Sequence, residues 1–187
     1  GVTKKTLSVL KEKLSKGMLP QWVVTDPDIY ELEVQGIFAK TWQFLAHESE
    51  LPEPGSFLTR WIVNDPVLLV RNQNGEIKAF LNSCTHRGTI LCAADHGNKR
   101  AFTCPYHGWT FNLDGELIGI IAGDKIYGEA MVKSEWNLRP IPRLESYRGM
   151  IFANLDPNAM SLEEYLGDMK WYFDIFFTRS DNGMEVI

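Results

Sequence analysis

The segments CTHRGT at residues 84–89 and CPYHGW at residues 104–109 decide how the rest of this chain is interpreted. Each segment contains one cysteine and one histidine, and seventeen residues separate the two Cys/His pairs. Two thiolates and two imidazoles make a complete set of four metal ligands: Cys84, His86, Cys104 and His107. Such a set can hold a zinc ion or an iron–sulfur cluster of mixed ligation, so the spacing alone leaves both open.

A glycine follows each histidine closely. Gly88 is two residues after His86, and Gly108 comes directly after His107. Glycine permits backbone conformations that are closed to other residues and lets backbone N–H groups approach a sulfur atom. We therefore expect each Cys/His pair to lie on a tight loop, with both loops projecting from one end of a β domain.

These segments are similar to the two cluster-binding loops of Rieske proteins, in the variant of the α subunits of aromatic-ring-hydroxylating oxygenases. The resemblance covers nearly the whole chain, but only the N-terminal part of that family's α subunit. Beyond the two loops it includes TDP (25–27), the stretch from Ile37-Phe38 to Trp42, HES (47–49), PG (54–55) and FANLDP (152–157).

The resemblance implies a mainly β fold built around an antiparallel Rieske [2Fe–2S] domain. We expect a helical arm over residues 1–41, the Rieske domain over 42–157, and a helix that begins a catalytic domain over 158–187. Cys84 and Cys104 are implied to bind one iron, and His86 and His107 the other. The residues implied to surround the cluster are Arg87, Gly88, Tyr106, Gly108 and Trp109.

The neighbours of the ligands bear on the reduction potential. High-potential Rieske proteins add two cysteines and a hydroxyl donor where this chain has Thr89, Tyr106 and Trp109. With fewer hydrogen bonds to the reduced cluster, we expect the low end of the Rieske range of about −150 to +300 mV. Two roles stay open for Trp109, a contact surface between subunits or a lid over the cluster. Arg87 is expected either to hydrogen-bond at the cluster mouth or to form a structural ion pair.

The implied function is to pass electrons from a ferredoxin or reductase, supplied by NAD(P)H, to a mononuclear Fe(II) that hydroxylates an aromatic substrate with O₂. In the family that iron is held by two histidines and a carboxylate in a second domain, and α subunits form trimers, some with a small β subunit. Outside the two loops this chain has only His47 and His96, far apart in sequence. The segment is therefore expected to lack the catalytic iron site.

Two other functions remain open on the residues alone. A standalone Rieske ferredoxin would carry electrons by diffusion, but such ferredoxins are shorter and lack the helical first forty residues and the helix after Asp156. A zinc-stabilised binding module would use the same four ligands. Whether the chain is a fragment, a split-gene product or an independent carrier stays undecided.

Composition and net charge limit the class of protein and the kinds of partner that this chain can have. The chain has 187 residues, 44% of them hydrophobic and 23% charged, which is ordinary for a globular protein. A net charge of −5 argues against nucleic acid, because phosphate binding favours a basic face. No apolar run reaches membrane-spanning length. With two of three cysteines assigned as ligands, Cys92 is left unpaired, which suits a reducing, cytoplasmic setting.

Turn and periodicity signals predict the elements. Leucines at helical spacing predict a helix ending near Gly17, and Thr25-Asp26-Pro27-Asp28 predicts the start of another. Strands are expected over 42–46, 57–63, 67–71, 77–82, 109–112, 117–121 and 150–155, with strand residues also at Phe102 and Leu144, and with a two-residue turn at Asn74-Gly75. Residues 121–139 are expected to form a loop. Ser161 to Glu164 has capping-box spacing and predicts one helix towards Phe173, whose aromatic end either packs back or meets a partner.

Four further candidates are weaker. His47 is expected to be structural, His96 a solvated loop residue, and Cys92 a buried apolar side chain. Lys99 and Arg100 are expected to be solvated, with docking of an acidic electron donor as the alternative.

Overall fold

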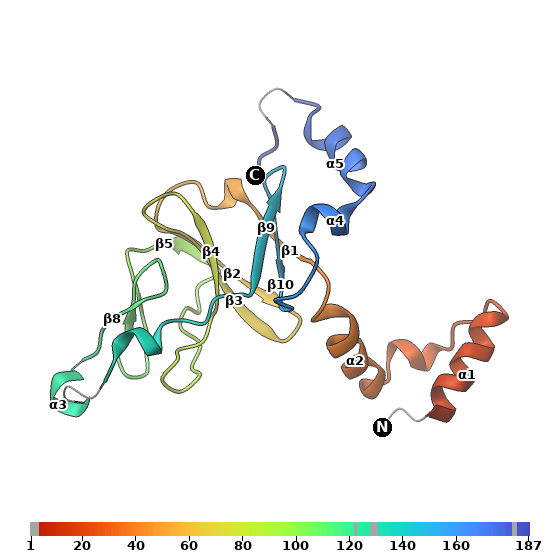
Figure 1. Cartoon of the computed structure of the whole chain (residues 1–187), viewed down its shortest axis with the longest axis horizontal. Coiled ribbons are helices and arrows are strands. Elements are labelled where there is room, and N and C mark those ends of the chain that lie inside the picture. Colours follow the sequence, from red (N-terminus) through yellow and green to blue (C-terminus); the bar gives the residue numbers. More distant parts are fainter. Residues whose placement is uncertain (1–3, 122, 128–130, 181–182) are drawn as a thin grey trace.

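A four-stranded antiparallel sheet forms the centre of the computed structural model, which describes residues 4–121, 123–127, 131–180 and 183–187 (Figure 1). Its strand order is β4-β3-β2-β5. The strands are β2 (Ser56–Ile62), β3 (Asp65–Arg71), β4 (Ile77–Leu81) and β5 (His96–Asn98). Strand β3 is apolar without alternation because both of its faces are buried: Leu68 and Val70 belong to one hydrophobic core, Val67 and Leu69 to another.

Two three-stranded antiparallel sheets supply the other walls of these cores. One has the order β1-β10-β9 and comprises β1 (Gln43–His47), β9 (Arg143–Tyr147) and β10 (Met150–Asn154). The other has the order β6-β7-β8 and comprises β6 (Phe102–Thr103), β7 (Thr110–Phe111) and β8 (Leu117–Gly119). The expected mainly β, antiparallel fold is confirmed.

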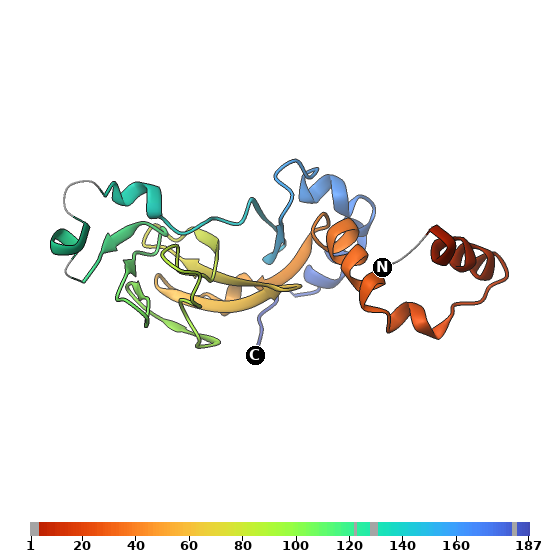
Figure 2. The ribbon, with the colours of Figure 1, turned by 90° about the horizontal axis from the view of Figure 1, so that it is seen from below.

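Residues 4–40 contain the predicted helices, which extend from one end of the molecule (Figure 2). They are α1 (Lys4–Ser15) and α2 (Pro27–Glu33), with a 3₁₀ turn at Gln21–Val24 and a π-helical turn at Val34–Phe38. The Asp26 carboxylate caps α2 by accepting from the N–H groups of Asp28 and Ile29. Gly17 follows α1 with a φ of 70°, a conformation suited to a helix end.

The C-terminal helix is divided in two, contrary to the single helix expected. Helix α4 (Leu162–Leu166) begins with the predicted capping box of Ser161 and Glu164. Gly167 then takes a φ of 48°, which ends α4 before α5 (Met169–Phe177) begins. Leu162 and Leu166 pack with Trp42 and Phe152 on the outer face of β1 and β10, and Phe173 adds to this cluster. Trp171 and Phe176 remain exposed, so only part of the aromatic end packs back.

Two turns differ from the sequence expectation. The β2–β3 turn is at Val63-Asn64, so Asp65 and Pro66 already belong to β3. The β3–β4 connection is longer than two residues, because the Asn72 N–H donates to Glu76 O and the Asn72 side chain accepts from the N–H groups of Asn74 and Glu76. Gly75 has a φ of 83°, as in a three-residue hairpin loop.

The stretch expected to be a loop contains α3 (Gly123–Tyr127) and a 3₁₀ turn at Lys133–Trp136. Residues 122 and 128–130, which fall in the same stretch, lie outside the described residues. Helix α3 is at the end of the molecule opposite α1 (Figure 1). No helix among the described residues has the length and apolar character needed to span a bilayer.

Candidate metal centre

The two Cys/His segments fold into equivalent loops. The first follows β4 and the second joins β6 to β7. In the first loop the Cys84 N–H donates to Thr89 O and the Gly88 N–H donates to Cys84 O, each at 2.8 Å. The second loop repeats both bonds at 2.7 and 3.0 Å, from Cys104 to Trp109 O and from Gly108 to Cys104 O. The histidine, however, is two residues after the cysteine in the first loop and three residues after it in the second.

Both loop glycines have a left-handed backbone conformation, with φ of 74° at Gly88 and 70° at Gly108. A side chain at either position would be strained for that reason. A Cβ at Gly108 would in addition overlap with the side chain of Ile121, whereas one at Gly88 would make only an ordinary contact, with Ser83 Oγ at 3.9 Å.

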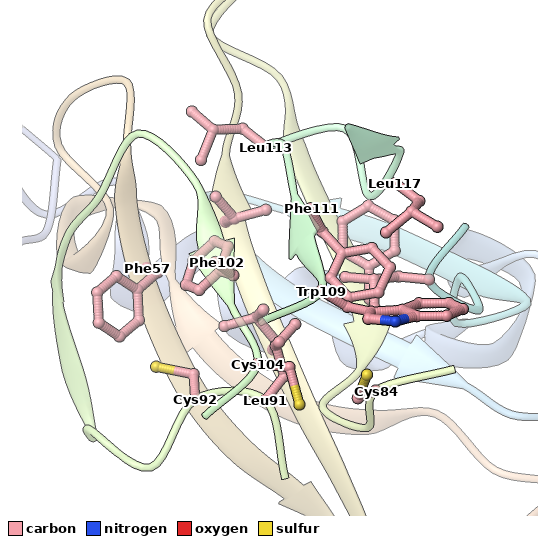
Figure 3. Close-up of a cluster of buried hydrophobic side chains, with 14 residues drawn as sticks. Phe57, Cys84, Leu91, Cys92, Phe102, Cys104, Trp109, Phe111, Leu113 and Leu117 are labelled. Atoms are coloured by element: carbon pink, nitrogen blue, oxygen red, sulfur yellow. The ribbon is translucent and has the colours of Figure 1, made fainter. Parts of the chain in front are cut away.

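The thiols of Cys84 and Cys104 are buried and face each other beneath the indole of Trp109 (Figure 3). Burial raises the pKa of the Cys84 thiol, and the neighbouring Cys104 thiol raises it further. Backbone N–H groups of His86 and Arg87 point at the Cys84 sulfur and act in the opposite direction. Two adjacent thiolates would thus be unfavourable by themselves, and a bound cation would favour them.

The two imidazoles form the other half of the centre. The rings of His86 and His107 have their centroids 4.7 Å apart and lie 72° from parallel. His86 Nδ1 is buried and has no hydrogen-bond partner among the described residues. Burial, followed by the nearby His107 and Arg87, lowers the pKa of His86 and so favours the neutral ring that binds metals. A buried nitrogen without a partner is the observation that calls for a ligand here.

The four side chains do not converge on a single point. Within the described residues, no three or more Cys, His, Asp or Glu side chains are placed to share one metal ion. A structural zinc ion needs four ligand atoms around one point at about 2.0–2.3 Å. A thiol pair and an imidazole pair that lie side by side fit a two-metal cluster better.

A different aromatic side chain packs against each of the two imidazoles. Trp109 stacks on His86 with the centroids 4.7 Å apart and the planes 8° from parallel. The ring of Tyr106 lies over the ring of His107 with the centroids 3.8 Å apart, and Tyr106 is 58% exposed. Because Trp109 is only 1% exposed, its proposed role as a subunit contact surface is wrong, and the role of a lid over the centre remains.

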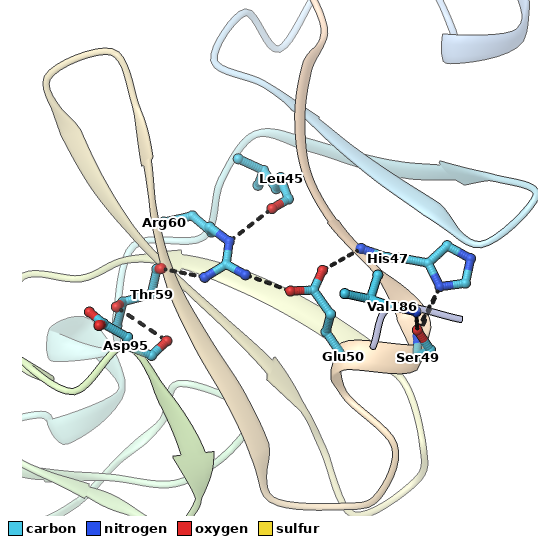
Figure 4. Close-up of polar contacts among 8 residues, drawn as sticks. All are labelled: Leu45, His47, Ser49, Glu50, Thr59, Arg60, Asp95 and Val186. Atoms are coloured by element: carbon cyan, nitrogen blue, oxygen red, sulfur yellow. Dashed lines mark hydrogen bonds and ion pairs between the residues drawn. The ribbon is translucent and has the colours of Figure 1, made fainter. Parts of the chain in front are cut away.

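His47 has the structural role expected of it. It is buried, and its Nδ1 lies 3.2 Å from the backbone N–H of Ser49, which donates to it, and 2.9 Å from the Ser49 hydroxyl (Figure 4). The Glu50 carboxylate accepts from the His47 backbone N–H at 2.8 Å and pairs with Arg60 at 2.7 Å. These contacts close the turn after β1.

The remaining candidates lie apart from the centre or have other partners. Cys92 is buried in the apolar core, as expected. His96 is exposed, but it belongs to edge strand β5 and not to a loop. Lys99 lies over the rings of Phe57 and Phe102 at 5.6 and 5.8 Å, and Arg100 is exposed. Arg87 is exposed and forms no ion pair with the described residues, and both of its expected roles stay predictions.

Sequence reasoning missed two residues next to the centre. The Thr85 hydroxyl donates to the backbone carbonyl of Trp136 at 2.6 Å, and the Trp136 ring packs against Trp109. The one signal available was a tryptophan in a polar stretch, Lys133–Trp136, that otherwise reads as loop. Its contact with residue 85 spans fifty-one positions and cannot be read from local pattern.

Comparisons with known proteins show the family to which the chain belongs. The Rieske [2Fe-2S] domain family matches residues 41–134. The chain is 41% identical over 172 residues to biphenyl 2,3-dioxygenase subunit alpha of Rhodococcus jostii, which covers 91% of the chain and 37% of that relative. It is 38% identical over 178 residues to N,N-dimethyl phenylurea N-demethylase subunit alpha of a Sphingobium species, which covers 95% and 39%.

Among solved structures, naphthalene 1,2-dioxygenase from a Rhodococcus species bound to indole superimposes with a TM-score of 0.93 at 46% identity. The match covers 99% of this chain and 43% of that one. The chain thus spans well under half the length of the relatives it matches.

Proposed function

The chain belongs to the Rieske [2Fe–2S] domain family and corresponds to the N-terminal Rieske portion of aromatic dioxygenase α subunits, and on this premise we propose that it is the electron-transfer portion of a terminal oxygenase. The observation that carries the proposal is the pairing of two buried thiols with two adjacent imidazoles on equivalent loops, where His86 Nδ1 has no partner among the described residues.

We assign Cys84 and Cys104 to one iron of the cluster, and His86 and His107 to the other. The unpartnered nitrogen and the facing thiols fit this division. When bound, the cluster would accept and release one electron at a time. The two thiolates supply the negative charge that balances the oxidised cluster, while neutral imidazoles add none and so make reduction easier.

The chain's own residues shape the environment of that site. The N–H groups directed at the Cys84 sulfur stabilise negative charge there. Trp109 and the apolar core keep water from the thiols, and the exposed His107 leaves one ligand at the surface, where an electron can cross.

The activity of a whole oxygenase is proposed on the strength of the relatives. Electrons would come from NAD(P)H through a reductase or ferredoxin and go to a mononuclear iron that uses O₂ on an aromatic substrate. That iron would be held by parts of the α subunit beyond those matched here, with other α subunits, in a trimer, and a small β subunit as partners. The relatives at 41% and 38% identity bear the names of a dioxygenase and an N-demethylase, so substrate and reaction type stay unassigned. A reducing cytoplasm suits three cysteines that form no disulfide in the described chain.

Two alternatives are less well supported. A single zinc ion is disfavoured because the four side chains do not share one point. A standalone ferredoxin is disfavoured because the likeness to naphthalene dioxygenase extends over 99% of the chain, including the helices before β1 and after β10.

Metal and sulfide analysis tests the proposal. Purified protein should contain about two irons and two acid-labile sulfides per chain. Cys104→Ala and His107→Ala should lose the cluster, whereas Cys92→Ala and His96→Ala, which change a cysteine and a histidine outside the two loops, should retain it. A colourless wild type with one zinc per chain would refute the assignment.

A further inference from the structure

Trp136 lies one aromatic layer outside the candidate centre. Its ring packs nearly perpendicular to Trp109, with centroids 5.4 Å apart and planes at 78°. Trp109 in turn stacks on His86. Since Trp109 is 1% exposed and Trp136 is 38% exposed, Trp136 is the layer that meets solvent.

Hydrogen bonds join the segment that carries Trp136 to the first ligand loop and to the β7–β8 hairpin. The Thr85 hydroxyl, between the ligands Cys84 and His86, donates to Trp136 O at 2.6 Å. Directly after Trp136, the Asn137 side chain accepts from the Leu117 N–H at 2.9 Å, and the Leu138 N–H donates to Gly115 O at 2.7 Å. We call the segment Lys133–Trp136 the cover of the centre. The first ligand loop binds the C-terminal end of this cover, and the β7–β8 hairpin binds the residues that follow it.

A hollow of about 330 Å³ lies between the cover and the centre. His86 and Trp109 line its inner side, and the other residues that line it are Tyr127, Met131, Val132, Glu135 and Trp136. Apart from His86 and Glu135 its walls are largely apolar, so they offer few hydrogen-bond partners to water. Truncation of Trp136 would widen this hollow and expose the Trp109 ring on the His86 side.

We propose that Trp136 is a positioning residue for the cluster, an inference that rests on the proposed function. Through Trp109 it holds the plane of the His86 ring, and with the Thr85 hydrogen bond it keeps bulk water from the Trp109 ring that stacks on His86. Reduction adds one negative charge to the site, and water stabilises charge better than an apolar wall does. Opening the cover therefore raises the reduction potential.

Redox titration of four variants, followed by pulsed EPR of the reduced protein in D₂O, tests this. Trp136→Ala removes the ring, and Thr85→Val removes the tether but keeps every ring. Both should raise the potential and strengthen the couplings of solvent deuterons to the cluster. Trp136→Phe keeps a ring and should stay near the wild type. Trp171→Ala is the matched control, because this tryptophan is 62% exposed on α5 and its ring contact is with Tyr172.

Several results would overturn the inference. One is a Trp136→Ala protein with wild-type potential and deuteron couplings. Another is an equal shift in Trp136→Ala and Trp136→Phe, because the ring would then have no role. If Trp136→Ala assembles no cluster, the test rests on Thr85→Val. A wild-type reduction potential in Thr85→Val would then contradict the inference. A wild type that contains no [2Fe–2S] cluster removes the proposed function itself, which distinguishes that failure from a failure of the cover.

Discussion

Asn82 ties together the two ends of the segment that carries Cys84 and His86. Its side chain, 3% exposed, donates to Cys92 O at 2.7 Å and accepts from the Cys92 N–H at 2.9 Å. Asn82→Ala would leave two buried backbone groups unpaired, at about 1–3 kcal/mol each. Urea denaturation should therefore show a loss of about 2–6 kcal/mol in the free energy of unfolding.

Asn74→Ala is the matched control for Asn82→Ala. Asn74 is exposed in the β3–β4 turn, and its side chain makes no hydrogen bond within the described chain, so the change should stay within about 0.5 kcal/mol. Equal losses in the two variants would show that the Asn82 bonds do not hold the loop.

The two loop glycines should respond differently to alanine. Both carry the cost of a left-handed backbone, about 1–2 kcal/mol. Only Gly108 would also collide with Ile121, so Gly108→Ala should melt at a lower temperature than Gly88→Ala. Adding Ile121→Ala to Gly108→Ala should bring the melting temperature up to that of Gly88→Ala. If the two single variants melt together, the Ile121 contact has no energetic role.

At the scale of elements, two hairpin turns repeat one pattern and bind each other. NQNGE at 72–76 and NLDGE at 112–116 each have an N–H···O bond between their first and last residues and a glycine with positive φ. In both, the first asparagine accepts from the third and fifth N–H groups. Asp114 of the second turn accepts from Asn72 of the first at 2.9 Å and pairs with Lys78 at 3.0 Å.

This link between hairpins predicts a pH dependence. The hydrogen bond from Asn72, followed by that from Lys78, lowers the pKa of Asp114. A carboxyl with a lowered folded pKa adds stability that is fully present above the unfolded value of about 3.9 and is lost as pH falls through the folded value. Asp114→Asn should therefore lower the melting temperature at pH 7, by the equivalent of about 0.2–1 kcal/mol for an exposed pair.

The difference between Asp114→Asn and the wild type should shrink as pH falls below about 4. Glu116→Gln is the control, because its carboxylate bonds only within its own hairpin, to Asn112, among the contacts of the described chain. A difference that is constant from pH 7 down to pH 2 would contradict the role given to the Asp114 charge.

How far the sequence predicted these elements depends on how local each cause is. Strand β3 and the capping box at Ser161 could be predicted, because the apolar run 67–70 and the Ser161/Glu164 spacing are local signals. The β3–β4 turn could not, since Asn72 competes for the backbone with Asn74-Gly75. Gly167 was a single residue inside a helical pattern, and only its φ of 48° divides α4 from α5.

For the molecule as a whole, the four residues assigned as ligands were predictable as a set, because chemistry and spacing coincide in two segments. The contacts of Trp136 and Thr85 were not, since Trp136 meets Trp109 and Thr85 only through the tertiary fold. The burial of Trp109 likewise depends on the core between two sheets.

This 187-residue chain should not hydroxylate substrates by itself. His47 is buried in the turn after β1 and His96 lies on the edge strand β5, and no three Cys, His, Asp or Glu side chains of the described chain are placed to share one metal ion. With a reductase, O₂ and aromatic compounds, the expected result is a reduced cluster and no cis-diol or phenol above a metal-free control. Product formation dependent on the protein would contradict it.

The central claim is a two-iron cluster held by two thiolates and two imidazoles, and electron–nuclear double resonance of the reduced protein tests it most directly. The account predicts a spin-½ signal coupled to two imidazole nitrogens, lost or replaced in His86→Cys and unchanged in His47→Gln and His96→Gln. A two-iron signal without nitrogen coupling, or a protein that contains a single zinc ion, would contradict it.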